Sequence, residues 1–346
     1  MWGGAVMKSV AELKLEGKKV LVRCDFNVPL EHQRIADTSR IDASLDTIRY
    51  VLNHGGAAVL CSHLGRPKGR SPELSLAPVA DYLGKALGKR VLLTPDCIGD
   101  LALRMAHDLP QGEVLLLENL RFHAEEEAND QVFASQLAFG KNIYVNDAFG
   151  TAHRAHASTV GVVHFLAEHA AGFLMLREVT ALRAVTEEPA HPYVAILGGV
   201  KVSDKINVVR AFLTKADTIL VGGAMAYTFL AAGCEDVGNS LVESDKLDLA
   251  KGLLAEAERR KVALVLPTDH VVASSPENGS DAQTVKHIPK GMMGLDIGPL
   301  TTSNFGSRLA GARTVIWNGP LGYSERPSFR QGTLTVGQIV SVGWSI

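Results

Sequence analysis

The stretch YVAILGGVKVSDKI, residues 193–206, decides the fold of this chain. An apolar run at 193–197 leads through Gly198 and Gly199 into a segment that carries two lysines four residues apart. A short, unbroken apolar run of this kind is typical of a parallel strand that is covered on both faces. The stretch therefore predicts a strand, a tight glycine turn and a helix.

The same pattern recurs along the whole chain. Further apolar runs of four or five residues, alternating with helical patterns, lie at 19–23, 57–61, 90–93, 113–117, 142–146, 218–222, 262–266 and 314–318. This alternation predicts an α/β protein. Because 346 residues are too many for one average core, we predict two Rossmann-like parallel-sheet lobes.

The predicted domains are separated by a helical pattern between the apolar runs at 142–146 and 193–197. We predict an N-terminal domain over residues 1–171, a long hinge helix over 172–189 and a C-terminal domain over 190–346. The helical pattern ends at Glu187, Glu188 and Pro189, where a proline stops a helix. A long helix between two lobes suits hinge closure around substrates.

Composition excludes several classes of protein. The net charge of −2 provides no global positive field for nucleic acid or an anionic membrane, so any basic site must be local. The N-terminal MWGGAVMKSV lacks the apolar core of a signal peptide, and no run is long enough to span a membrane. Cys24, Cys61, Cys97 and Cys234 form no CxxC pair and lie in or beside apolar runs. We therefore expect buried free thiols in a cytoplasmic protein.

Polar residues follow the apolar runs at 19–23, 57–61, 113–117 and 142–146, and a ligand of an open parallel sheet binds at such strand ends. These segments, together with a helical segment that begins at residue 39, contain Arg23, Asp25, Asn27, Arg40, His63, Arg66, Arg121, His153 and Arg154. Any one of these arginines is most simply a surface charge. Several guanidinium groups at one edge would repel each other unless an anion neutralises them. The N-terminal half therefore predicts a site for a small, multiply negative metabolite.

The C-terminal half carries weaker signals. Lys201 and Lys205, one helical turn apart near a helix start, can reach phosphate oxygens together, or they can simply be solvated. Gly222 and Gly223 can admit a flat group such as adenine, although a tight turn followed by core residues is the simpler interpretation. Glu325 can bind ribose hydroxyls or face solvent. Because no GxGxxG follows a strand, a dehydrogenase-type nucleotide site is disfavoured.

Two other polar clusters are interpreted as structural. The HRAH segment at 153–156 offers histidines three residues apart, but no third ligand follows at helical spacing and the neighbouring arginines oppose a cation. We therefore expect no metal site there. Glu125, Glu126 and Glu127 are interpreted as a solvated helix start.

Seven stretches taken together establish a resemblance to a known family. The stretches are VRCDFNVPL, SHLGRPKG, LLLENLRF, NDAFGTAHRAHAST, AILGGVKVSDKI, GGAMAYTFL and VIWNGPLG. In this order they closely resemble phosphoglycerate kinases, from Lys19 to Gly322. The resemblance implies reversible phosphoryl transfer between 1,3-bisphosphoglycerate and MgADP, giving 3-phosphoglycerate and MgATP, in the cleft of a monomeric enzyme.

The resemblance also implies which residues act. It assigns the phosphoglycerate to Asp25, Phe26, Asn27, Arg40, His63, Leu64, Gly65, Arg66, Arg121 and Arg154. It assigns the nucleotide to Gly199, Lys201, Lys205, Gly222, Gly223, Gly294 and Glu325. As the catalytic residues, Arg40 and Lys201 would act on the transferring phosphoryl group. No protein ligand of a metal is expected, and Mg²⁺ would enter with ADP or ATP.

The sequence departs from the family in three places. Val200 stands where the family commonly has alanine, and GYSE at 322–325 replaces a more apolar approach to the glutamate. After Gly322 the resemblance fades, and no GGGDT turn, which binds nucleotide phosphates in the family, is present. We therefore expect an incomplete C-terminal domain from a shortened or frameshifted reading frame. Losing two or three charge-assisted hydrogen bonds would slow catalysis by roughly three to four powers of ten. The alternative is a binding protein that retains only the phosphoglycerate site.

Overall fold

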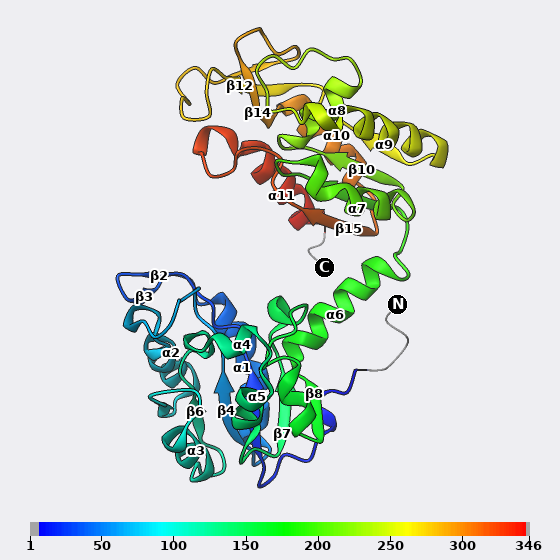
Figure 1. Ribbon diagram of the computed structural model, residues 1–346. Helices are drawn as coiled ribbons and strands as arrows, with labels where there is room; N and C mark the ends of the chain where they lie inside the picture. Colours follow the sequence, from blue (N-terminus) through cyan, green and yellow to red (C-terminus); the bar gives the residue numbers. More distant parts are fainter. Residues whose placement is uncertain (1–6, 344–346) are drawn as a thin grey trace. The chain divides into compact units, whose positions relative to one another are not determined.

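The computed structural model describes residues 7–343 and divides the chain into two compact units, Met1–Leu182 and Arg183–Ile346 (Figure 1). The expectation about a signal peptide falls largely on residues 1–6, which lie outside the described residues. None of the helices within residues 7–343 has the length and apolar character needed to cross a bilayer.

The first unit is built on a six-stranded sheet in the order β5-β6-β4-β1-β7-β8, with every neighbouring pair parallel. Its strands are β1 (Lys19–Arg23), β4 (Ala57–Cys61), β5 (Val91–Leu93), β6 (Val114–Leu116), β7 (Ile143–Asn146) and β8 (Glu168–Ala171). The first five confirm the sequence prediction to within a residue at each end. β8 was not predicted, because its residues, EHAA, are neither apolar throughout nor β-branched.

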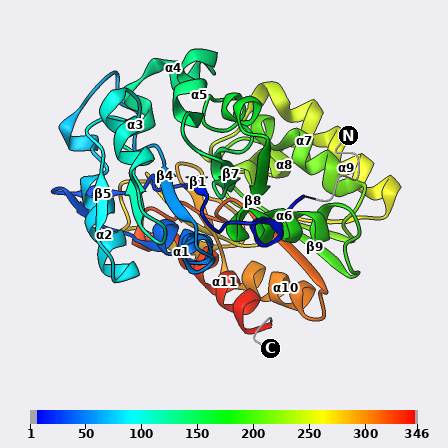
Figure 2. The same cartoon turned by 90° about the horizontal axis from the view of Figure 1, so that it is seen from below.

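Helices cover both faces of this sheet. Along β1, Val20 and Val22 pack in one cluster with residues of α1 and α2, whereas Leu21 packs on the opposite face with residues of α3 and α5. Figure 2 shows these two helical layers on either side of β1 and β4. The unit also contains a short β2–β3 hairpin and α4. The helices are α1 (Ser39–Asn53), α2 (Ala77–Leu87), α3 (Asp100–His107), α4 (Ala124–Glu127) and α5 (Gln131–Ala138), and the hairpin strands are β2 (Leu30–Glu31) and β3 (Arg34–Ile35).

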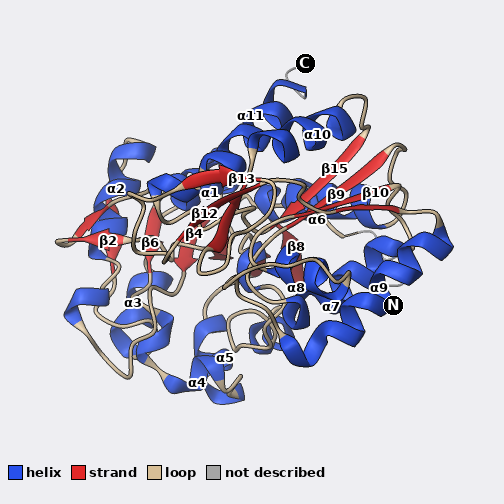
Figure 3. Ribbon diagram, turned by 90° about the horizontal axis from the view of Figure 1, so that it is seen from above, coloured by secondary structure: helices blue, strands red, loops and turns tan. Residues whose placement is uncertain are grey.

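The second unit contains a parallel sheet in the order β11-β10-β9-β15. Alternate residues of β9 again face two cores: Ala195 packs with α7, α8 and α9, and Val194 and Ile196 pack with α10 and α11. Figure 3 shows these helical layers on the two sides of the strands. The elements are β9 (Tyr193–Leu197), α7 (Val202–Leu213), β10 (Thr218–Val221), α8 (Met225–Ala232), α9 (Leu247–Arg260), β11 (Ala263–Val265), α10 (Pro299–Leu309), β15 (Thr314–Asn318) and α11 (Gln331–Gly343). All four predicted strands are confirmed, and with them the fold class of two Rossmann-like parallel sheets.

A second sheet in this unit was not predicted. The antiparallel strands β12 (His270–Ala273), β13 (Gln283–Val285) and β14 (Met293–Ile297) pair in the order β13-β12-β14. Their short runs are interrupted by polar residues and glycine, so they lack the apolar pattern used to find the other strands. The sheet has its own small core, which includes Tyr227 and Val272.

The predicted helix between the lobes is α6 (Phe173–Thr186). Its first turn is held by the buried Asp147, whose Oδ1 atom accepts hydrogen bonds from the N–H groups of Leu174 (2.9 Å) and Met175 (3.2 Å). Met175 is the one residue of the fourteen in α6 that is buried, so this helix is sparsely packed. The predicted domain borders, at residues 171 and 189, stay predictions.

The cysteines follow the sequence prediction with one exception. Cys24, Cys61 and Cys97 are buried free thiols. Cys234 is exposed, so the prediction was wrong for this residue. It lies just beyond α8 with a φ of 66°, at the point where the chain leaves the helix.

Candidate functional site

The carboxyl ends of adjacent strands bring the predicted residues of the first unit together. β1 lies between β4 and β7, and β6 lies next to β4, so the loops after these strands are neighbours. The N–H of Gly65 donates to Oδ1 of Asn27 at 2.8 Å, and Nη1 of Arg121 donates to the carbonyl of Gly65, also at 2.8 Å. Residues from three separate loops therefore form one rim.

Arg40 and Asp25 form the exposed part of this rim. Nη1 of Arg40 lies 2.9 Å from Oδ2 of Asp25, and the Arg40 side chain is 52% exposed. Both residues line a pocket of about 290 Å³, together with Phe149 and Gly150. An exposed ion pair of this kind contributes little to stability. The Arg40 guanidinium is therefore available to an anion that enters the pocket.

His63 lies at the centre of a positive field. Its side chain is buried, and Nη2 of Arg23 lies 3.2 Å from its Nδ1 atom. Burial, followed by the charges of Arg23, Arg121 and Arg154, lowers the pKa of His63 to about 2. The ring is therefore neutral throughout the physiological range.

Arg121 is a buried cation with spare hydrogen-bonding capacity. Nη2 of Arg121 lies 3.1 Å from Oε1 of Glu127, and burial lowers the pKa of Arg121. Within residues 7–343, the buried Nε atom of Arg121 has no hydrogen-bond partner. Arg154 is half-buried, and His153 and Arg66 are exposed. A buried, unpaired guanidinium N–H beside other cations is suited to an anionic ligand.

Two predicted residues occupy the core instead of the rim. The side chains of Phe26 and Leu64 are buried within the hydrophobic cluster of the first unit. Their backbone N–H groups are also used, because Phe26 donates to Ser62 Oγ (2.8 Å) and Leu64 donates to Asn119 Oδ1 (3.2 Å). These residues can thus contribute to a ligand site only by positioning the loops.

Sequence reasoning missed the residues that support the rim. Asn119 is completely buried, and it accepts from the N–H groups of Leu64 and Arg121 and donates to the carbonyl of Leu64. Its place directly after an apolar run was the signal that could have found it. Glu126 was predicted to be solvated, but it is fully buried, and two hydrogen bonds from Ser158 compensate for its lost hydration.

In the second unit, three glycine loops interlock at the carboxyl edge of the sheet. The N–H of Gly199 donates to the carbonyl of Pro320 (3.0 Å), and the N–H of Gly223 donates to the carbonyl of Leu321 (2.8 Å). A Cβ atom on Gly223 would overlap the backbone of Gly199, and one on Gly222 would overlap Leu321. These glycines therefore have a packing role whether or not a nucleotide binds beside them.

The two lysines lie at the start of α7. Lys201 is exposed and precedes α7 as its N-cap residue, whereas Lys205 lies within the first turns. That both ammonium groups can reach phosphate oxygens together stays a prediction. Nζ of Lys205 donates to Oδ1 of Asn318 at the end of β15. The start of α7 is occupied, because Glu243 accepts hydrogen bonds from the N–H groups of Val202 and Ser203.

The other predicted nucleotide residues lie on separate elements. Gly294 is on β14, where a Cβ atom would overlap the Tyr227 ring, and its N–H donates to Ser240 Oγ at 2.8 Å. Glu325 is exposed in the turn after β15. Met225 and Phe229 are fully buried in the core, which is the simpler of the two interpretations of that stretch. The sharing of one nucleotide site by Gly294, Glu325 and the lysines stays a prediction.

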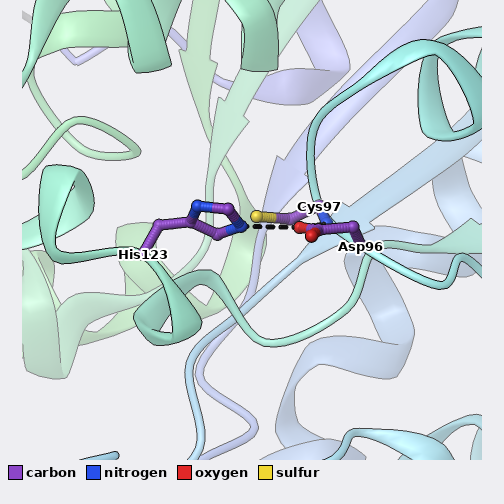
Figure 4. Close-up of side chains that lie close together, drawn as sticks. All are labelled: Asp96, Cys97 and His123. Atoms are coloured by element: carbon purple, nitrogen blue, oxygen red, sulfur yellow. Dashed lines mark hydrogen bonds and ion pairs between the residues drawn. The ribbon is translucent and has the colours of Figure 1, made fainter. Parts of the chain in front are cut away.

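One cluster of side chains in the first unit, among the residues that the structure describes, has the composition of a metal site. Asp96, Cys97 and His123 each offer an atom within 4.8 Å of the others (Figure 4). Nε2 of His123 lies 2.6 Å from Oδ1 of Asp96. Burial, and then the charge of Asp96, raises the pKa of the Cys97 thiol well above its usual value. Asp96 is therefore already paired with His123, and the raised pKa favours the protonated thiol.

Comparisons with known proteins agree with this geometry. Residues 10–343 match the family model described as "Phosphoglycerate kinase". A phosphoglycerate kinase of Anaeromyxobacter dehalogenans (strain 2CP-1) is 50% identical over 341 residues, which cover 97% of this chain and 86% of that protein. One of Solibacter usitatus is 53% identical over 340 residues, covering 96% and 85%. The solved phosphoglycerate kinase of Coxiella burnetii has a TM-score of 0.87 and 37% identity, and covers 98% of this chain and 86% of its own.

Proposed function

The chain belongs to the phosphoglycerate kinase family and is a phosphotransferase, and we propose that it transfers a phosphoryl group between 1,3-bisphosphoglycerate and MgADP. The products are 3-phosphoglycerate and MgATP, in glycolysis or, in reverse, in gluconeogenesis. We also propose that it acts as a cytoplasmic monomer with hinge closure. The pairing of phosphoglycerate with ADP or ATP follows from the family.

The positive field around His63 carries this proposal. Burial, followed by the charges of three arginines, lowers the pKa of His63 beside a rim whose Arg121 keeps an unpaired N–H. Such a field is unfavourable until an anion enters, and 3-phosphoglycerate offers both a phosphate and a carboxylate. We assign its binding to the side chains of Asp25, Asn27, Arg40, His63, Arg66, Arg121 and Arg154, and the positioning of the loops to Phe26, Leu64 and Gly65.

The nucleotide half of the reaction is assigned to the second unit. Since Glu243 already occupies the first N–H groups of α7, the phosphates would be bound by the ammonium groups of Lys201 and Lys205 beside the Gly199 loop. Gly222, Gly223, Gly294 and Glu325 would complete the nucleotide site. Phosphoryl transfer needs in-line placement and balanced charge more than a covalent nucleophile, so Arg40 and Lys201 would act by stabilising charge on the transferring group.

The test is calorimetric titration of the full chain with 3-phosphoglycerate and, separately, with MgADP, together with a coupled turnover assay. Binding of both with turnover is expected. The matched variants are Arg40→Ala against Arg49→Ala, which lies on the same helix, and Lys201→Ala against the exposed Lys251→Ala. Binding of 3-phosphoglycerate without turnover would leave a phosphoglycerate-binding protein, and failure of both titrations would overturn the proposal.

A further inference from the structure

A fully buried arginine directly behind the candidate site has no role in the functions assigned above. Arg23 ends β1 and is 1% exposed. Its Nε donates to Ser158 Oγ at 2.8 Å, its Nη1 donates to the carbonyl of Cys24, and its Nη2 lies 3.2 Å from Nδ1 of His63. All three nitrogens of the guanidinium are thus engaged, and the direction of its plane is fixed.

A buried hydrogen-bond network links the positive charge of Arg23 to the carboxylate of Glu126 through Ser158. Ser158 Oγ donates to Oε1 of Glu126 at 2.5 Å, and the N–H of Ser158 donates to Oε2 at 2.9 Å. The hydroxyl of Tyr144 donates to the carbonyl of Ser158 at 2.7 Å. A buried guanidinium is stable only when a counter-charge and hydrogen bonds compensate its lost hydration. Arg23, Ser158 and Glu126 together meet this requirement.

The chemistry of arginine decides the tautomer of His63. A guanidinium has only donors and stays protonated in proteins, so Nδ1 of His63 must be the acceptor of the contact with Nη2. A neutral imidazole that accepts at Nδ1 carries its proton on Nε2. Nε2 has no partner within residues 7–343 and is not among the buried unpartnered atoms, so it reaches the surface.

We propose that Arg23 is a positioning residue that locks His63 as the Nε2–H tautomer, so that His63 presents one neutral hydrogen-bond donor to an oxygen of the phosphoglycerate. The identity of this ligand rests on the proposed function, whereas the tautomer does not. The inference predicts a histidine that recognises its ligand without changing charge. It also predicts that the strength of this contact is independent of pH in the physiological range.

The groups that face His63 all act in the same direction. They are Arg23 from β1, Arg121 from the turn after β6, and Arg154 and His156 from the loop after β7. The charges of the three arginines disfavour a charged imidazole, as does burial. The buried carboxylate of the Arg23 network, Glu126, is hydrogen-bonded to Ser158 and lies 3.8 Å from His156, so its charge is shared within that network.

The first test is nitrogen NMR of the side-chain imidazoles in the full, ligand-free chain, with His63→Gln to assign the His63 signals. We expect the Nε2–H tautomer and no titration of His63 between pH 5 and pH 8. An Nδ1–H tautomer, or a titration of His63 in this range, would overturn the proposal. This measurement uses no substrate, so it decides the inference even if 3-phosphoglycerate does not bind.

The second test compares variants by calorimetry with 3-phosphoglycerate. Arg23→Met combined with Glu126→Gln removes both buried charges together, and Glu126→Gln alone is the reference. Releasing Nδ1 should weaken binding about tenfold at pH 8. Nitrogen NMR of the same double variant should show a mixture of the Nδ1–H and Nε2–H tautomers of His63, which a purely structural role would not produce. A pure Nε2–H tautomer in a folded double variant would contradict the proposal. If the double variant does not fold, the NMR result on the native chain stands as the decisive measurement.

Discussion

At the scale of single residues, the first unit separates binding groups from supporting groups by burial. Arg40 is half-exposed and forms an ion pair with Asp25, whereas Asn119 and Glu126 are completely buried and hold loops in place. Truncating an exposed side chain changes the ligand site without opening a cavity. Truncating a buried polar side chain leaves its partners unsatisfied.

The Arg40→Ala variant should therefore lose activity without losing stability. We expect kcat/KM to fall by about two to three powers of ten, as for removal of one charge-stabilising group. The unfolding free energy should change by less than about 0.5 kcal/mol, because the pair with Asp25 is exposed. Turnover assays and urea unfolding check this, with Arg49→Ala as the control. Parallel losses of activity and stability would contradict the assignment.

Asp147 should make stability depend on pH. Burial raises the pKa of Asp147 to about 6, above its ordinary value of 3.8, so the folded chain holds this proton more tightly than the unfolded chain. From pH 4 to 6 the folded state therefore binds more protons, and the unfolding free energy falls as pH rises, by up to about 3 kcal/mol for this group.

The matched variant for this prediction is Asp147→Asn, which keeps the oxygen that accepts from α6. Urea unfolding at several pH values between 4 and 7 should show a shallower decline than in the native chain. The decline should not vanish, because burial also raises the pKa of Asp296 to about 6. An identical slope in the native and variant chains would show that Asp147 does not carry this linkage.

At the scale of elements, the starts of α6, α7 and α11 are closed by carboxylates that come from elsewhere in the chain. Asp147 closes α6, and Glu243 closes α7. Oδ2 of Asp296 accepts from the N–H of Gly332 at the start of α11 (2.8 Å). A carboxylate at this position satisfies N–H groups that have no partner in the helix and matches the helix dipole. Each cap also ties a loop or strand to a helix that is distant in sequence.

Glu243→Ala should destabilise the second unit, because it removes the partner of Val202 N–H and Ser203 N–H. The expected loss is about 1 to 2 kcal/mol in the free energy of unfolding, the range typical of helix caps. Glu243→Gln retains an acceptor oxygen and should lose less. Urea unfolding of the two variants side by side checks the prediction. If both variants unfold like the native chain, the cap contributes nothing measurable.

At the scale of the whole molecule, each unit has its own core on both faces of its own parallel sheet. The polar rim belongs to the first unit, and the interlocked glycine loops with their lysines belong to the second. Separate half-sites on separate cores predict that each ligand stabilises one unit locally. This property can be measured without turnover.

Hydrogen exchange should therefore distinguish the two ligands. At one hundred times its Kd, a ligand adds about 2.7 kcal/mol to the stability of the unit that binds it. We expect 3-phosphoglycerate to protect peptides that contain residues 23–27, 62–66 and 119–121, and MgADP to protect those with residues 198–205. Protection of the same peptides by both ligands would contradict the assignment of one half-site to each unit. Mass spectrometry after exchange provides the readout.

The sequence by itself determined the features that depend on local pattern. Nine apolar runs predicted nine parallel strands, since a strand covered on both faces must be apolar throughout, and the residues after these strands marked the rim. The antiparallel sheet around Val272 and the edge strand β8 were not predicted, because strands that are short or partly exposed lack this apolar pattern.

Only the tertiary structure decided which polar groups are buried and what they bind. Glu126 belongs to an acidic run that is typical of a solvated helix start, yet it is buried with Ser158 and Arg23, which are far from it in sequence. Lys201 has helical spacing from Lys205, yet it lies ahead of the helix as its cap residue. Hydrogen bonding and desolvation depend on neighbours that folding supplies, and no local pattern encodes these neighbours.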